Sequence, residues 1–237
     1  MNRHYRQPVT IHFGNGTITR LKDEIRLTGK KRGILITSPS FEKNGLAARL
    51  VTDSDGTLVT TYSGISPNPD IRECNTCIKA IRENAGDYLD RKIPLPPDRL
   101  PLIAVPTTAG TGSEITRVAV LSDHEKGIKT PLDTPTFYPD IALIDPELTW
   151  TVPRHITACT GMDVLCHAIE AYRNIHHQPV CDALAIHAIR LVFRYLETAC
   201  EEPSNPLARE KMAEASVTAG MAFSLPGTPP PTPVPAR

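Results

Sequence analysis

Short apolar runs alternate with amphipathic stretches along the first 150 residues. The runs are rich in β-branched side chains, which is typical of buried strands. Between them, apolar residues recur at the spacing of helices. Strands that alternate with helices predict a parallel sheet with right-handed crossovers. The expected strands are residues 10–13, 34–37, 58–62, 102–105, 118–121 and 141–144, and the expected helices are residues 17–28, 41–51 and 69–84.

From Pro153 onward the pattern is helical, with helices expected over residues 180–200 and 207–223. Prolines are dense after Ser224, and a helix cannot form there because proline lacks the N–H donor and clashes with the preceding turn. The fold class is therefore an N-terminal α/β domain with a parallel sheet, followed by an all-α domain. The predicted domains are residues 1–150, 151–224 and a Pro-rich disordered tail, 225–237.

Composition narrows the function classes. Lys+Arg and Asp+Glu number 26 each in 237 residues, so no charge excess indicates nucleic acid or an anionic membrane as a partner. No apolar run reaches the roughly 20 residues that span a bilayer. The first residues do not resemble a signal peptide, so we expect a cytoplasmic protein whose six cysteines are reduced thiols. Cys74 and Cys77 form a Cys-x-x-Cys pair, which we interpret as two helical thiols rather than a redox or zinc site.

A loop of threonines and glycines follows the strand expected at residues 102–105. Thr107, Thr108 and Thr111 supply hydroxyl groups, and Gly110 permits a tight turn close to a ligand. Free hydroxyl and N–H groups at the carboxyl end of a strand suit a phosphate or ribose. An ordinary strand-to-loop turn has the same composition, so the residues alone leave both interpretations open.

Asp163 and His167 are four residues apart in an expected helix, so their side chains lie on one face. A carboxylate oxygen and an imidazole nitrogen in that arrangement can bind one divalent ion. The spacing alone also fits a surface ion pair.

Three motifs in order resemble the iron-containing (group III) alcohol dehydrogenases. They are Pro-Thr-Thr-Ala-Gly-Thr-Gly-Ser-Glu at residues 106–114, Ile-Asp-Pro-Glu-Leu-Thr at 144–149 and Gly-x-Asp-x-x-x-His-Ala-x-Glu-x-Tyr at 161–172. The resemblance implies a dinucleotide-binding first domain, a helical metal-binding second domain that is truncated in this chain, and a homodimer. It implies oxidation of small alcohols or reduction of aldehydes with NAD or NADP and a divalent metal, Fe²⁺ before Zn²⁺.

The resemblance also assigns site residues. Asp163 and His167 match two metal ligands, and no catalytic residue is implied beyond the metal ligands. Glu170 and Tyr172 are interpreted as supporting or packing groups, and His155, His176 and His177 as loop residues. The residues matched to the cofactor site are Thr107, Thr108, Gly110, Thr111, Lys129 in a polar loop near the nicotinamide ribose, and Leu148 beside the nicotinamide.

Ser38 stands where enzymes of this family often carry an aspartate that hydrogen-bonds the adenosine ribose. Because that carboxylate would repel a 2′-phosphate, a serine predicts that NADP is also accepted. Ser38 can also cap the helix that follows, and the two roles are compatible.

The chain departs from the family twice. The strand and Gly-Gly-Gly-Ser loop expected after residues 69–84 are absent, which would leave two neighbouring strands without a partner. Two later histidine ligands are also missing, and the helices expected over residues 180–200 and 207–223 contain only one histidine, His187. A shifted reading frame or a natural partner-binding tail would account for residues 225–237. The alternative function is therefore a non-catalytic remnant or a module that dimerises through its N-terminal strand.

Overall fold

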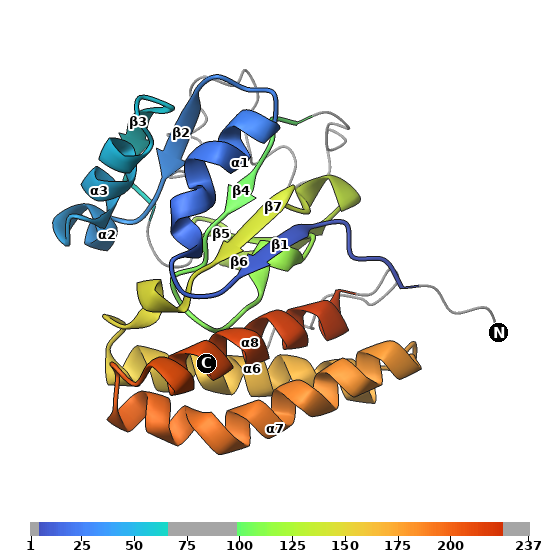
Figure 1. Cartoon of the computed structure of the whole chain (residues 1–237). Coiled ribbons are helices and arrows are strands. Elements are labelled where there is room, and N and C mark those ends of the chain that lie inside the picture. The colour runs from blue at the N-terminus through green and yellow to red at the C-terminus, as the bar shows by residue number, and fades with distance from the viewer. Residues whose placement is uncertain (1–4, 66–98, 225–237) are drawn as a thin grey trace. The chain divides into compact units, whose positions relative to one another are not determined.

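A computed structural model describes residues 5–65 and 99–224 and contains a parallel sheet and a helical C-terminal region, as the sequence predicts (Figure 1). The chain forms two compact units. One comprises Met1–Ile18, Pro101–Arg117 and Phe137–Arg237, and the other comprises Thr19–Leu100 and Val118–Thr136. The domain boundaries at residues 150 and 224 stay predictions.

The first unit contains a three-stranded parallel sheet. Strands β1 (Thr10–Phe13), β7 (Ile141–Ile144) and β4 (Ile103–Ala104) lie in the order β1-β7-β4. Every residue of the central strand β7 is buried, as expected for a parallel strand covered on both faces. Because all three strands are parallel, their carboxyl ends meet at one edge.

Three long helices complete this unit: α6 (Arg154–Arg173), α7 (Pro179–Glu201) and α8 (Pro206–Phe223). In Figure 1, α8 lies between the strands and the other two helices. Ala213 and Val217 of α8 pack with β7 residues, whereas Met212 and Ala219 pack with α6 and α7. Many residues of α8 after Met212 are small, including Ala213, Ala215, Ser216, Ala219 and Gly220, so neighbouring segments can approach its backbone closely.

The second unit contains two parallel strands, β2 (Gly33–Ile36) and β3 (Leu58–Tyr62), with helices α1 (Leu21–Leu27), α2 (Pro39–Lys43) and α3 (Leu46–Asp53). The single helix predicted over residues 41–51 is wrong. Gly45 adopts a left-handed φ of 81°, which ends α2 and separates it from α3.

This unit also contains an antiparallel hairpin of β5 (Val118–Asp123) and β6 (Ile128–Asp133). Strand β6 was not predicted, because Pro131 interrupts its alternation and proline is normally confined to edge strands. The placement of Lys129 in a polar loop is therefore wrong, since Lys129 lies in β6 opposite Ser122.

Several predictions concern residues outside the described ranges: the helix at 69–84, the Cys74–Cys77 pair and the tail at 225–237. Within the described ranges, β4 pairs only with β7, and β2 pairs only with β3. The gap left by the family's absent strand stays a prediction. No helix of the described segments has the length and apolar character needed to cross a membrane.

Candidate functional site

Loops follow the carboxyl ends of β1, β7 and β4. Asp145, which directly follows β7, connects the loop after β7 to the loop after β1. The Asp145 carboxylate is buried at the end of β7. It accepts a hydrogen bond from the Ile18 N–H at 3.1 Å and another from the Glu147 N–H at 3.1 Å. These bonds fix the start of the turn Pro146–Thr149, which carries the half-buried Leu148.

The threonine- and glycine-rich loop is the third, and it is seated on helices α6 and α8. The Gly110 N–H donates to the buried Ser216 Oγ at 3.0 Å. A Cβ added at Gly110 would lie 3.0 Å from the Thr160 Cβ, so only glycine fits here without displacing α6.

The loop turns back toward its 3-10 helix (Ser113–Ile115) at Gly112, where φ is 63°. A Cβ on Gly112 would approach the Gly220 Cα to 2.9 Å, which is closer than side-chain and backbone atoms pack. The two glycines therefore bring the loop and α8 into backbone contact.

The hydroxyl groups of the loop are available to a ligand. Thr108 and Thr111 are exposed and Thr107 is half-buried. Within the described residues, Thr107 and Thr108 form no side-chain hydrogen bond, whereas Thr111 bonds Ser113. The loop thus offers polar groups from a backbone that close packing holds in place.

Asp163 and His167 project from α6 one turn apart. The His167 Nε2 lies 3.9 Å from the Asp163 Oδ1, and the two side chains are 17% and 41% exposed. Because metal–ligand distances are about 2.1 Å, a single ion can contact both atoms. The His167 ring packs against Phe223 at a centroid distance of 5.2 Å, which restricts the imidazole.

The loop and the Asp163–His167 pair share one side of α6. Thr160, which contacts Gly110, precedes His167 by seven residues, or two helical turns. Residues at that separation lie nearly above one another. The two features that the sequence singled out therefore meet on one helix, although their roles stay predictions.

The described part of the chain does not supply a full set of metal ligands. Within it, no three or more His, Cys, Asp or Glu side chains lie close enough together to hold an ion. His187, the later histidine, instead pairs with Glu214 at 2.8 Å. Asp163 and His167 fit a divalent ion by chemistry and distance, but they supply only two ligands.

The sequence-based interpretations of His155, Glu170 and Tyr172 need correction. His155, expected in a loop, lies in the first turn of α6. Glu170 and Tyr172, interpreted as supporting or packing groups, are exposed. His176 and His177 do lie in the turn between α6 and α7, as expected.

The two remaining cofactor candidates, Ser38 and Lys129, belong to the second compact unit. Ser38 occupies the N-cap position of α2, but its side chain makes no capping bond and its Oγ lies 2.7 Å from the Ser40 Oγ. Lys129 is exposed on β6.

Sequence reasoning missed Glu114, which follows the glycine-rich loop directly. Its side chain is only 6% exposed, and burial away from water raises the pKa of its carboxyl to about 7. Phe223 was also missed as a neighbour of His167. Glu114 ends the motif at residues 106–114, which could have drawn attention to it. No pattern in the sequence pointed to Phe223, since a phenylalanine at a helix end is common.

Comparisons with known proteins point to one family over most of the chain. A family model described as iron-containing alcohol dehydrogenase matches residues 8–89 and 85–146, and one described as the C-terminal part of the Fe-containing alcohol dehydrogenase family matches residues 157–228. The 1-propanol dehydrogenase PduQ of Citrobacter freundii is 38% identical over 92% of this chain and 62% of its own length. The choline dehydrogenase of Bacillus subtilis is 33% identical over 91% and 62%.

Among solved structures, sulfoacetaldehyde reductase from Bifidobacterium kashiwanohense in complex with NAD⁺ is 44% identical, with a TM-score of 0.91 over 96% of this chain and 68% of that chain. A 1,3-propanediol oxidoreductase is 31% identical with a TM-score of 0.84. The chain spans less than two thirds of the length of the curated relatives named above.

Proposed function

The chain belongs to the iron-containing alcohol dehydrogenase family, and from that premise we propose that it interconverts a small aldehyde and its alcohol with NAD and a divalent metal. The observation that carries the proposal is the seating of the Thr107–Gly112 loop on α6, the helix that presents Asp163 and His167. This contact brings a candidate cofactor loop and a candidate metal pair together within one compact unit.

The loop residues are proposed to hold the cofactor. The unbonded hydroxyls of Thr107 and Thr108 and the polar group of Thr111 suit ribose and phosphate oxygens. Gly110 keeps the backbone close to α6, and Leu148 offers an apolar side chain from the neighbouring turn. The similarity to a reductase in complex with NAD⁺ supports a dinucleotide.

Asp163 and His167 are proposed to hold the metal, with Fe²⁺ favoured by the family and Zn²⁺ as the alternative. A bound divalent ion would act as a Lewis acid toward the substrate oxygen, and the nicotinamide would accept or donate the hydride. His167 would contribute its neutral imidazole, whose orientation is limited by Phe223.

Two finer proposals involve the second unit. Ser38 in place of an acidic residue supports acceptance of NADP, because no carboxylate repels a 2′-phosphate at that position. Lys129 is proposed to contact the nicotinamide ribose. We also propose a homodimer formed through the N-terminal strand, which sedimentation velocity would test. The proposed location of the protein is the cytoplasm.

A non-catalytic remnant or dimerising module is the second candidate. It is favoured by the metal donor set, which the described residues leave at two ligands. Two protein ligands completed by water normally bind a divalent ion weakly, whereas catalytic sites usually retain three.

The experiment combines metal content with turnover. Protein reconstituted anaerobically with Fe²⁺ is analysed for bound iron and assayed for oxidation of NADH and NADPH with propionaldehyde. The enzyme proposal predicts iron-dependent turnover that Asp163→Asn abolishes, while Glu197→Gln, at an exposed position on α7, leaves it unchanged. A folded chain with no bound iron and no turnover would support the remnant instead.

A further inference from the structure

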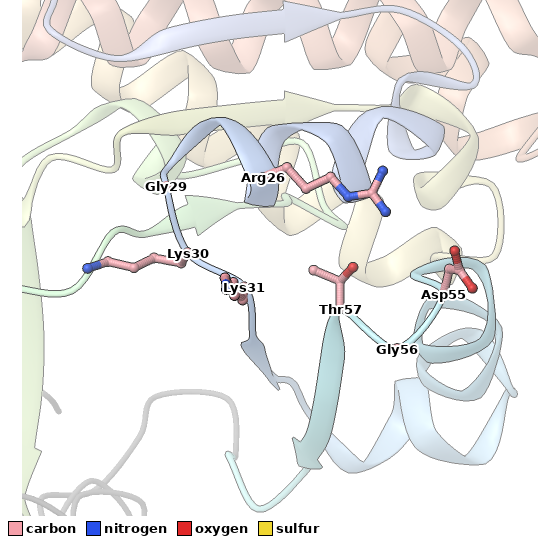
Figure 2. A pocket seen from close by; sticks show the side chains of 7 residues that line it. All are labelled: Arg26, Gly29, Lys30, Lys31, Asp55, Gly56 and Thr57. Carbon is pink, nitrogen blue, oxygen red and sulfur yellow. The ribbon is translucent and has the colours of Figure 1, made fainter.

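A polar cavity of about 390 Å³ lies in the second compact unit, and its lining includes none of the residues assigned to the dehydrogenase site (Figure 2). It is lined by the end of α1, by the turn that leads into β2 and by the turn that precedes β3. Its lining residues are Arg26, Gly29, Lys30, Lys31, Asp55, Gly56 and Thr57.

Positive charge dominates this cavity. Arg26, Lys30 and Lys31 are exposed, and within the described residues none of them forms a hydrogen bond or ion pair through its side chain. The one carboxylate, Asp55, is already bound by the Lys22 ammonium at 2.7 Å. That contact, with the charge of Arg26 as a smaller contribution, lowers the pKa of Asp55 and keeps it ionised. Three unpaired cations therefore remain.

The Thr57 hydroxyl supplies a second feature. Thr57 as a residue is only 6% exposed, and its hydroxyl has no hydrogen-bond partner within the described part of the chain. In Figure 2 this hydroxyl lies on the same side as the guanidinium of Arg26. The hydroxyl oxygen remains accessible to solvent, so a ligand oxygen can reach it and form a hydrogen bond with it.

Gly56, Lys30 and Lys31 supply further donors to the cavity that Arg26 and Thr57 line. Gly56 has a φ of 75°, and its N–H has no acceptor in the described segments. Lys30 and Lys31 follow Gly29 in the turn that leads into β2. In Figure 2 Lys30 extends away from Thr57, and its long side chain has the rotatable bonds to turn toward a negative charge.

We propose that this cavity binds a phosphate-bearing anion, held by Arg26 and the Thr57 hydroxyl and neutralised by Lys30 and Lys31. The lining excludes other ligand classes. It presents no large apolar side chain for an apolar ligand, and a metal cation would find one carboxylate among three positive charges. Arginine suits phosphate through its planar pair of N–H donors, and the volume lies within the range of small-molecule sites.

The cavity does not include Ser38, the predicted cofactor contact at the other end of β2. It lies at the amino ends of β2 and β3, whereas Ser38 follows the carboxyl end of β2. A strand of four residues puts roughly 13 Å between the two at about 3.3 Å per residue. Binding here would be a second anion site rather than part of the dinucleotide site.

Isothermal titration with sodium tripolyphosphate, at 50 and 200 mM salt, tests the proposal on the full chain. We expect saturable binding at one site that weakens at the higher salt. Arg26→Gln should raise Kd at least about tenfold and Thr57→Val about three- to tenfold, while Arg26→Lys retains most of the affinity. Lys43→Gln, an exposed cation on α2 outside the cavity, is the matched control.

Repeating the titration with adenosine triphosphate distinguishes the two sources of phosphate. Equal affinities assign the cavity to a bare phosphate chain, and tighter binding of the nucleotide, still lost in Arg26→Gln, assigns it to a phosphorylated metabolite. The proposal is overturned if no saturable binding occurs, if Arg26→Gln binds as tightly as the parent protein, or if Lys43→Gln weakens binding equally. Circular dichroism of each variant confirms that it is folded.

Discussion

Glu114→Gln should stabilise the protein at neutral pH, because it replaces a buried carboxyl with a neutral group of the same shape. The Glu114 side chain is 6% exposed, and desolvation raises the pKa of its carboxyl from 4.5 to about 7 in the folded state. The folded protein therefore holds this proton more tightly than the unfolded chain does. Its contribution to stability is fully present below pH 4.5 and is lost as the pH rises through about 7.

The magnitude follows from the two pKa values. Each pKa unit corresponds to about 1.4 kcal/mol, so the rise from 4.5 to about 7 amounts to about 3 kcal/mol between acid and neutral pH. Since folded domains are stable by roughly 5–15 kcal/mol in total, this difference is easily measured. The neutral amide does not titrate, and Glu114→Gln should thus escape the loss.

Urea unfolding followed by circular dichroism at pH 4, 5.5, 7 and 8 gives the assay. The free energy of unfolding of Glu114→Gln minus that of the parent should be near zero at pH 4 and about 3 kcal/mol at pH 8. Glu197→Gln, at an exposed position on α7, removes the same charge without the burial and should show no such rise. A pH-independent difference, or a variant less stable at pH 8, would refute the reasoning.

Three further predictions concern backbone contact, buried charge and cofactor choice. Gly112→Ala should lower the free energy of unfolding in urea by about 2–4 kcal/mol, because φ is 63° and the new Cβ would lie 2.9 Å from the Gly220 Cα. Gly45→Ala, where φ is 81° and no atom lies near the new Cβ, should lower it by only about 1 kcal/mol. Equal losses in the two variants would contradict the contact between Gly112 and Gly220. Arg209→Met should cost about 2–4 kcal/mol by the same measurement, because this buried guanidinium donates to three oxygens at 2.7–3.1 Å; a neutral result would show that water replaces those bonds. Ser38→Asp should raise the KM for NADPH at least about tenfold and leave that for NADH nearly unchanged, and parallel changes would remove Ser38 from the cofactor site.

Local residue choice was enough to place most strands and helices. Strand β7 is a run of four apolar residues that Asp145 follows. All four residues are buried, as their apolar composition predicts. The long helices also followed from periodicity, because a helix of about 20 residues repeats its apolar positions several times. Short elements were less certain, and one glycine sufficed to divide the predicted helix at residues 41–51 into two.

Strand β6 shows why some elements escape such reasoning. Its proline argues against a strand when the sequence is considered alone, yet a two-stranded hairpin accepts proline because one edge needs no ladder donor. Whether a strand is an edge is a property of its neighbours, which the sequence does not state.

The sequence by itself determined the family, the order of the elements and the chemistry of the candidate residues, because motifs and periodicity are local properties of the chain. It could place Asp163 and His167 on one helical face, but it could not say which loop lies beside them. The tertiary structure decided that the Gly110 backbone rests against Thr160 on the same helix. It also decided that Glu114 is buried and that Arg26 and Thr57 line one cavity. These are consequences of packing between segments far apart in the chain, and desolvation and shared cavities arise only once those segments meet.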